Sequence, residues 1–431
     1  MSILKAGFSR VEITPEMGVP ISGYYVPRQV EGVLDPLFVN GLAFTDGENT
    51  TILLVCDLLG LYGSAPIAQE LVAAEMGIPK EAVFITNTHT HTGGNAVYGP
   101  YFEFLKPRLV EAAKLAFQDM APVTKISAGE DIVKEVTFVR RFLMDDGHYQ
   151  TWAKDRDPHI VNYETDGDES MRVVRFEREN KKELLFVNYQ VHPDNVGGNL
   201  VSADFIGTLR DEVEAKKPDC YCVFFQGAEG QLINTDFWHG TVPKSIEKAN
   251  KAGHLLAEGV FKLLPDLKEL PNDCKVRFGS SSVVLPTKRD PKKIPVSKRI
   301  IELHEAGRDK EIFPPYDRLP LVAQAYKYVQ LEKDQMDEIT LTETFMTVGP
   351  LAFAGIPGEP FAEIGIITRE GSPYPVTFLC ALTNGAEGYF PTKLAYEHGG
   401  YEPRNSFLKD GAAELLAEAA VEGLKEIYKK G

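Results

Sequence analysis

The sequence predicts an α/β protein with a mixed, largely parallel sheet covered by helices. Three observations support this. Short apolar segments typical of buried strands alternate with amphipathic, helix-like segments along nearly the whole chain. Reactive polar side chains directly follow several of the apolar segments. The chain has 431 residues, enough for one large core, and no repeat or low-complexity linker divides it. We therefore expect a single domain spanning residues 1–431.

Runs of apolar residues predict buried strands at 51–55, 83–86, 184–189, 221–225, 351–354 and 376–382. Helical periodicity predicts helices at 64–77, 104–118, 207–217, 245–264, 361–368 and 410–430. The first helix is expected to begin at Ser64, because a serine shortly before a proline is typical of a helix N-terminus. Further β-rich segments at 136–142 and 171–176 indicate that the sheet is mixed.

Residues from about 286 to 336 differ from the rest of the chain. They are rich in charged residues and contain Pro291, Pro295, Pro314, Pro315 and Pro320. We interpret them as a helical excursion over the surface, which acts either as a lid or only as a solvated connector.

Composition excludes several classes of function. The formal net charge of −16 and the pI of about 5.1 are opposite to the basic surface that a nucleic-acid-binding protein needs. No signal peptide and no apolar stretch long enough for stable membrane insertion is recognisable. The five cysteines lack the spacing of a disulfide framework or a zinc knuckle. We expect a cytoplasmic protein that acts on a small molecule, and the oligomeric state stays open.

Two histidines are the strongest candidates for a functional site. His89 and His91 lie in the segment Thr-His-Thr-His-Thr-Gly-Gly, shortly after the predicted strand at 83–86. Side chains alternate along a strand, so residues two apart point the same way, and the glycines leave room for a ligand. The segment therefore suggests a metal site at the rim of a sheet, although a short motif taken alone is wrong about as often as it is right.

Three further polar residues follow predicted strands: His192, Glu359 and Tyr389. Sites in open α/β sheets form beyond the carboxyl ends of strands. Two histidines and a carboxylate are a common zinc set, and a tyrosine can complete it or donate a hydrogen bond. Taken alone, each residue has an ordinary interpretation, as a core histidine, a helix cap or a packed aromatic ring. Their combination is what favours a metal centre.

The same residues, with several motifs around them, resemble the neutral/alkaline non-lysosomal ceramidase family. The resemblance begins at Ala-Gly-Phe-Ser-Arg-Val-Glu-Ile-Thr-Pro (6–15) and includes the double-histidine segment. It continues through Ser-Ala-Asp-Phe-Ile-Gly (202–207), Gln-Gly-Ala-Glu-Gly (226–230), Pro-Gly-Glu (357–359) and Gly-Tyr (388–389). These motifs span nearly the whole chain in the order of the family, so the resemblance implies the family's fold.

The resemblance also implies roles for individual residues. The zinc ligands would be His89, His192, Glu359 and Tyr389, with one zinc ion per chain. The residues near the substrate would be His91, Arg140 and either Tyr396 or Tyr401, of which we choose Tyr401. Asp57 and Asp204 would be hydrogen-bond partners of the ligating histidines. An additional Mg2+ or Ca2+ ion stays open.

Two departures from the family affect the expected substrate. The family carries a serine near the end of its Gln-x-x-Gly segment, and here Ile233 or Asn234 takes that place. From the resemblance we also expect the 431 residues to correspond to the catalytic domain alone, without the C-terminal β-sandwich domain of the family. Both departures favour a small, soluble substrate over ceramide.

We therefore consider three hypotheses. The first is a zinc-dependent hydrolase that cleaves an amide or ester bond with metal-activated water. In it His91 would serve as a general base or as a hydrogen-bond partner near the water, and Arg140 would stabilise an oxyanion or hold a substrate carboxylate. The second is a genuine ceramidase or N-acyl-lipid amidase. The third is a binding or regulatory protein that holds a metal without turnover.

Overall fold

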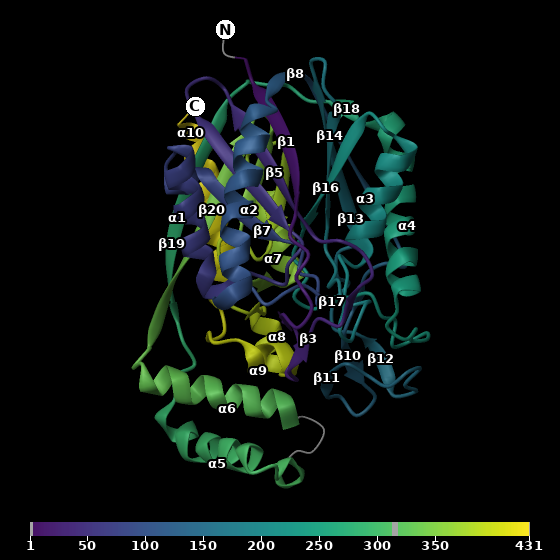
Figure 1. Ribbon diagram of the computed structural model, residues 1–431. Coiled ribbons are helices and arrows are strands. Elements are labelled where there is room, and N and C mark those ends of the chain that lie inside the picture. Colours follow the sequence, from purple (N-terminus) through teal and green to yellow (C-terminus); the bar gives the residue numbers. More distant parts are fainter. Residues whose placement is uncertain (1–2, 313–317, 431) are drawn as a thin grey trace.

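The computed structural model describes residues 3–312 and 318–430 and contains two main sheets (Figure 1). The strands of the larger sheet run in the order β16 (Cys220–Gln226), β14 (Glu183–Tyr189), β13 (Ser170–Arg178), β8 (Ala121–Ile132), β1 (Lys5–Glu12), β5 (Phe38–Thr45), β6 (Thr50–Cys56) and β7 (Val83–Asn87), and β18 (Lys268–Glu269) pairs with β8. The smaller sheet has the order β19 (Val276–Pro286), β20 (Glu338–Val348), β21 (Leu351–Gly355) and β23 (Val376–Cys380).

Both sheets are mixed, as predicted, but most neighbouring strands in them are antiparallel. The parallel pairs are β6–β7, β14–β16 and β21–β23. A helix connects the strands of each pair: α1 (Ala65–Met76), α3 (Phe205–Lys216) and α7 (Ala362–Gly371), respectively. The prediction of a largely parallel sheet is therefore wrong, because the alternation of strands and helices reflects only these three βαβ units. β5 and β6, joined by a short turn, pair antiparallel, as do β1 and β5 across a longer connection, and periodicity does not distinguish these arrangements from parallel ones.

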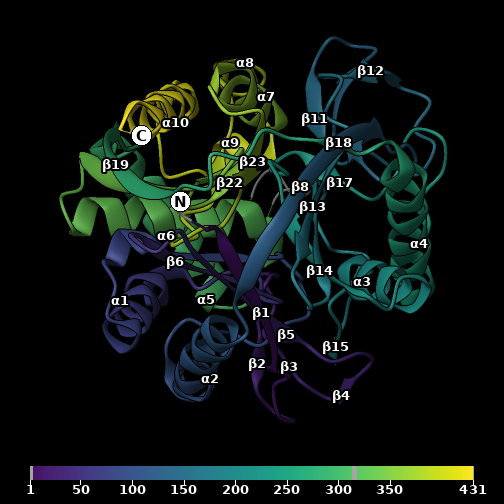
Figure 2. The same ribbon diagram turned by 90° about the horizontal axis from the view of Figure 1, so that it is seen from above.

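Helices cover the outer faces of the sheets, as the view from above shows (Figure 2). Besides α1, the helix α2 (Gly99–Gln118) contacts β1 and β5 of the larger sheet. The other end of this sheet is covered by α3 and α4 (Ile246–Leu263), which pack on each other. The smaller sheet is covered by α7 and α10 (Ala412–Lys429). The inner faces of the two sheets are left to form the core.

Phenylalanine rings join the three βαβ units in this core. Phe84 of β7, Phe225 of β16 and Phe353 of β21 are fully buried. The ring centres of Phe225 and Phe353 are 5.3 Å apart, and those of Phe84 and Phe353 are 6.1 Å apart. Burying each such ring stabilises the fold by about 1.5–3 kcal/mol. The packing also holds the parallel strand pairs against one another, so their carboxyl ends form one region.

The predicted strands and helices are present, with differences at their ends. The helix predicted at 104–118 begins at Gly99, because Pro100 takes a position in its first turn where no backbone donor is needed. Strand β23 ends at Cys380, two residues earlier than predicted, since Leu382 has a positive φ of 52°. Ser64 precedes α1 as expected, but its hydroxyl accepts a hydrogen bond from the backbone of Tyr98 rather than from the helix.

The described part of the excursion at 286–336 is largely helical. It contains α5 (Ile294–Glu305) and α6 (Arg318–Lys333) and leaves the body between β19 and β20, which pair antiparallel out to Pro286 and Glu338. Pro314 and Pro315 lie outside the described residues. Figure 1 shows the two helices beyond the end of this ribbon, and α6 contacts the short helix α9 (Tyr401–Asn405). The excursion therefore lies beside the region where the strand ends meet.

No helix within residues 3–312 and 318–430 combines the length and the apolar character that crossing a membrane requires.

Two lysines attach the excursion to the body. The Lys288 ammonium donates to the carbonyl of Pro403, and that of Lys327 donates to the carbonyl of Asn405. Burial and the positive charge of Lys327 lower the pKa of Lys288 to about 7. In the unfolded chain the value is 10.5, so the unfolded chain binds more protons between about pH 7 and pH 10. The protonated Lys288 therefore opposes folding most below pH 7, and this effect is relieved as the pH rises.

We predict that Lys288→Met changes the pH dependence of stability. The free energy of unfolding of the variant minus that of the wild type should be most positive at pH 6–7 and should fall by pH 10. Urea titrations at several pH values measure this difference. A difference that grows with pH would contradict the prediction.

Candidate metal centre

The predicted ligands lie at the carboxyl ends of the three βαβ units. His89 follows β7, and His192 follows β14. Glu359 and Tyr389 begin the short strands β22 (Glu359–Pro360) and β24 (Tyr389–Phe390), which follow β21 and β23. These two strands pair in parallel with Glu359 opposite Tyr389. The topology therefore brings together four residues that are up to 300 positions apart in the sequence.

His89 and His91 approach each other for a different reason from the one expected. β7 ends at Asn87, so the pair lies in a loop and not on a strand. His89 has a positive φ of 72°, which is rare for a residue with a side chain and is typical of functional sites. Its backbone N–H donates to the carbonyl of Leu58. The two ring centres are 5.0 Å apart and the ring planes are nearly perpendicular.

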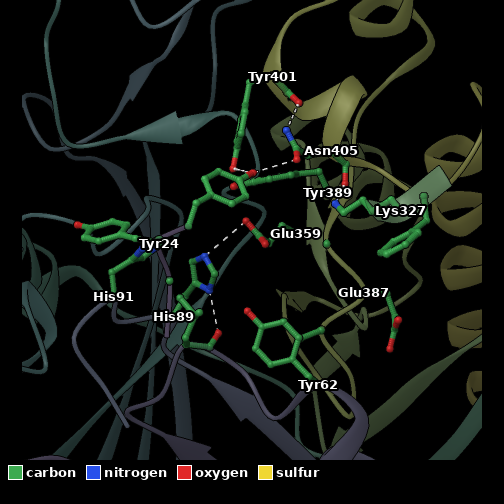
Figure 3. Close-up of a pocket in the computed structure, with 16 residues that line it drawn as sticks. Tyr24, Tyr62, His89, His91, Lys327, Glu359, Glu387, Tyr389, Tyr401 and Asn405 are labelled. Atoms are coloured by element: carbon green, nitrogen blue, oxygen red, sulfur yellow. Dashed lines mark hydrogen bonds and ion pairs between the residues drawn. The ribbon is translucent and has the colours of Figure 1, made fainter. Parts of the chain in front are cut away.

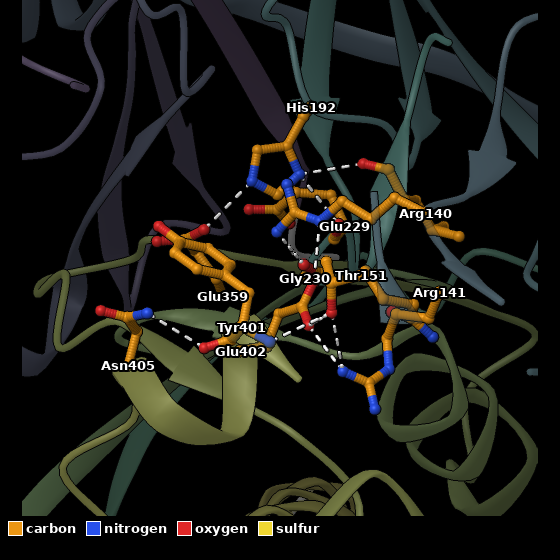
Figure 4. A network of polar contacts seen from close by, with 12 residues as sticks. Arg140, Arg141, Thr151, His192, Glu229, Gly230, Glu359, Tyr401, Glu402 and Asn405 are labelled. Carbon is orange, nitrogen blue, oxygen red and sulfur yellow. Dashed lines mark hydrogen bonds and ion pairs between the residues drawn. The ribbon is translucent and has the colours of Figure 1, made fainter. Parts of the chain in front are cut away.

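The imidazoles of His89 and His192 converge on the Glu359 carboxylate. Oε2 of Glu359 lies 3.2 Å from Nε2 of His192 and 3.4 Å from Nε2 of His89 (Figures 3 and 4). The Nδ1 atoms point away: that of His89 lies 2.8 Å from the carbonyl of Leu59, and that of His192 lies 2.9 Å from the carbonyl of Leu232. Each carbonyl accepts a hydrogen bond from Nδ1–H, which leaves Nε2 of each ring, when the imidazole is neutral, unprotonated and free to bind a metal ion.

This arrangement fits a divalent cation. The three side chains are almost fully buried, and in the described part of the chain Nε2 of His89 makes no hydrogen bond of normal geometry. Burial alone would lower the pKa of His89, but Glu359 outweighs it and raises the value to about 9. The same histidines hold the pKa of Glu359 well below its usual value, against the effect of burial. A cation that binds here would replace the proton that Glu359 stabilises on His89.

Asp57 and Asp204 do not contact the ligating histidines through hydrogen bonds, contrary to the expectation. Asp57 accepts from the backbone N–H of Phe38 and pairs with Arg210 at 3.0 Å. Asp204 accepts from backbone N–H groups at 195, 196 and 205 and begins α3. Both are buried and support the loops around the site. The position expected for a carboxylate is taken by main-chain carbonyls, which sequence alone does not reveal.

Arg140 lies behind Tyr389. Its Nε donates to Glu402 at 2.8 Å, and its NH2 group donates to the carbonyl of Gly230 at 2.8 Å (Figure 4). The guanidinium carbon is 5.5 Å from the ring centre of Tyr389. Burial and Glu359 raise the pKa of the Tyr389 hydroxyl, and the charge of Arg140 opposes this rise. Arg140 is thus placed to orient Tyr389 and to limit the rise in the pKa of its hydroxyl group.

A cavity of about 380 Å3 opens beside the convergent ligands (Figure 3). Aromatic and polar side chains dominate its wall, among them Tyr24, Tyr25, Tyr62, His89, His91, Lys327, Glu359, Glu387, Tyr389, Tyr401 and Asn405. Tyr401 lines the cavity, and its hydroxyl is 2.9 Å from that of Tyr25. Tyr396 donates instead to the carbonyl of Leu408, and Arg140 is not among the described residues of the wall. Of the two tyrosines left open, Tyr401 is therefore the one near the site.

His91 lies at the wall of this cavity. Burial lowers its pKa to about 3, so the imidazole is neutral. Nδ1 is 3.9 Å from the carboxylate of Asp194, a residue that the sequence analysis did not single out although it follows His192 by two positions. Gly23 approaches closely, because a Cβ atom there would lie 2.8 Å from Nδ1 of His91. The ring is thus held by packing at the edge of the cavity.

A second carboxylate that sequence reasoning missed lies near the ligands. The ligand atoms of His89, Glu229 and Glu359 are within 4.8 Å of one another, as are those of His89, His91 and His192. Glu229 belongs to the motif Gln-Gly-Ala-Glu-Gly, to which only a family resemblance had been attached. The signal that could have found it is its place directly after the strand predicted at 221–225.

Glu402 links two buried arginines beside the centre. It is fully buried and accepts from Nε of Arg140 at 2.8 Å and from NH1 of Arg141 at 2.7 Å. Burial alone would raise the pKa of Glu402, but the two guanidiniums hold it below its usual value. Removing one partner of a buried ion pair leaves an uncompensated charge, which costs about 3–5 kcal/mol.

Glu402→Gln is therefore expected to lower the free energy of unfolding by about 3–5 kcal/mol in chemical denaturation. The matched control is Glu103→Gln, which removes an exposed ion pair with Lys106 and should cost about 0–1 kcal/mol. Equal effects of the two substitutions would contradict this account of the network.

Comparison with solved structures identifies the architecture, whereas comparison by sequence finds no relative. No protein-family model and no curated protein matches the sequence. A solved ceramidase in complex with C2 superposes with a TM-score of 0.75 at 14% identity, over 100% of this chain and 76% of the other. The neutral ceramidase of Pseudomonas aeruginosa superposes with a TM-score of 0.71 at 16% identity, over 99% and 75%. At such low identity the likeness concerns the fold, and the chain has the fold of the neutral ceramidases.

Proposed function

We propose that the protein is a zinc-dependent hydrolase that cleaves an amide or ester bond in a small polar molecule. The observation that carries the proposal is the convergence of His89, His192 and Glu359 at the end of a cavity, with Nε2 of both rings directed at one carboxylate oxygen. Two histidines and a carboxylate are the donor set of many hydrolytic zinc sites. The ceramidase fold supports the same reaction class by analogy.

Each residue of the site has a definite task in this proposal. His89, His192, Glu359 and Tyr389 hold the ion, which supplies a Lewis acid for a carbonyl group and lowers the pKa of water. His91 borders the cavity and its imidazole is neutral, so it can form a hydrogen bond with water or substrate in the cavity. Tyr401 donates a hydrogen bond to the substrate from the cavity wall. Arg140 positions Tyr389 from behind instead of touching the substrate.

The cavity favours a short substrate with polar groups. Its volume of about 380 Å3 is at the lower end of the usual range for ligand pockets, roughly 300–1,000 Å3. The wall offers hydroxyl groups of several tyrosines, the Lys327 ammonium and the Glu387 carboxyl group. A long acyl chain would find few aliphatic partners there. N-acyl lipids nevertheless stay the second candidate, because the ceramidase fold is shared.

The first test measures metal content and hydrolysis together. We expect the wild type, purified without chelator, to contain about one zinc ion per chain and to hydrolyse members of a panel of short N-acyl amino acids, small amides, esters and N-acylsphingosine in detergent. His89→Ala and Glu359→Gln should lose the metal and at least about 100-fold in rate, since even outer partners of metal ligands contribute 10–100-fold. His254→Ala, on the exposed face of α4, is the control and should change neither.

The possible outcomes separate the three hypotheses. Full zinc content and activity in His89→Ala would contradict the proposed centre. Hydrolysis of N-acylsphingosine in preference to the short substrates would favour the lipid amidase. Zinc binding without turnover of any substrate would favour a non-catalytic protein.

A further inference from the structure

Glu229 is the buried acidic group of the site that the proposed mechanism leaves without a task. The residue has no exposed surface. Both of its carboxylate oxygens are buried, and neither makes a hydrogen bond of normal geometry to any described residue. The amide of Gln226 has two N–H groups: one donates to the carbonyl of Val191 at 2.8 Å, and the interaction of the amide with Glu229 is a minor one. An ionised carboxylate buried without a partner costs several kcal/mol, so such a group either stays protonated, as burial favours here by raising the pKa of Glu229 to about 8, or coordinates a metal ion.

The main chain around Glu229 fixes this carboxylate in place beside the other ligands. The carbonyl of Glu229 lies 3.0 Å from Nδ1 of His192. The next residue, Gly230, donates its N–H to the carbonyl of Pro360 at 2.9 Å. A Cβ atom at Gly230 would lie only 2.6 Å from the carbonyl oxygen of Glu359, so a glycine is needed for this approach. The loop after β16 is therefore packed directly on the segment that carries Glu359, and it also holds His192.

The distances agree with a common ion. One ligand atom from each of His89, Glu229 and Glu359 lies within 4.8 Å of the other two. Ligands bonded at about 2.0–2.2 Å to one zinc ion are separated by no more than roughly 4.4 Å, so these three atoms need to close by less than about 1 Å to share an ion. Of the buried glutamates whose two oxygens both lack partners in the described segments, Glu343 of β20 belongs to no such group. Burial alone therefore does not account for the place of Glu229.

We infer that Glu229 is a direct metal ligand, which adds a second carboxylate to the centre formed by His89, His192, Glu359 and Tyr389. This inference rests on the metal centre of the proposed function. A set with two carboxylates and a phenol is richer in oxygen than the set expected from the sequence. Oxygen donors suit Mn2+ better than they suit softer ions, so Glu229 should also narrow the preference of the site for Zn2+ over Mn2+.

The experiment measures metal affinity without any substrate. The dissociation constants of Zn2+ and Mn2+ are determined for the wild type and for Glu229→Gln, by chelator competition for Zn2+ and by the spectrum of free Mn2+ in electron paramagnetic resonance. We expect Glu229→Gln to weaken Zn2+ binding by at least about ten-fold and Mn2+ binding by a larger factor. The matched control is Glu343→Gln, which neutralises an equally buried glutamate and should leave both constants unchanged.

The variant His89→Ala distinguishes a failure of the role of Glu229 from a failure of the metal centre itself. Loss of Zn2+ binding in His89→Ala together with unchanged constants in Glu229→Gln would overturn the role of Glu229 and leave the proposed function intact. Unchanged binding in both variants would overturn the metal centre itself.

Should Glu229→Gln fail to fold, as circular dichroism would show, a crystal of the wild type loaded with Zn2+ decides. Anomalous scattering places the ion, and a bond of about 2.0–2.2 Å from Glu229 supports the inference. A coordination shell that is complete without a Glu229 oxygen overturns it.

Discussion

The structure depends on the packing of three parallel strand pairs against one another. Each pair is closed by its own helix, and each delivers side chains at its carboxyl end: His89 from one unit, His192 and Glu229 from the second, Glu359 and Tyr389 from the third. The buried rings of Phe84, Phe225 and Phe353 fix the relative positions of the units. The geometry of the centre is thus a property of the whole core. A cavity-forming substitution among these rings would displace ligands that it does not touch.

Much of the fold was predictable, because the strands and helices of the three βαβ units show the apolar runs and the helical periodicity typical of such elements. The strands that became β6, β7, β14, β16, β21 and β23 were recognised from their apolar runs, and the residues that follow them proved to converge. The direction of pairing was not predictable, since an antiparallel neighbour such as β8 is chosen by contacts distant in sequence. The same limit explains the error about Asp57 and Asp204. The histidines use carbonyls of Leu59 and Leu232, which any residue type could have supplied.

The charged side chains around the candidate metal centre form two separate groups. On one side, the carboxylates of Glu229 and Glu359 face the imidazole of His89. On the other, Glu402 lies between Arg140 and Arg141 and its charge is compensated within the protein. Tyr389 stands at the boundary, against Arg140 and opposite Glu359. The compensated side provides a rigid support, so that binding of an ion on the other side requires little rearrangement.

The excursion at 286–336 has a consequence for how such proteins diversify. Its two ends are held together where Pro286 of β19 pairs with Glu338 of β20. His89 and His192, which converge on Glu359, lie much earlier in the sequence. Lengthening, shortening or exchanging the helices between those ends leaves the sheet register unchanged. Yet Lys327 of α6 reaches the cavity wall. Changes in this insertion therefore alter what the cavity accepts without changing the sheets that hold the convergent side chains.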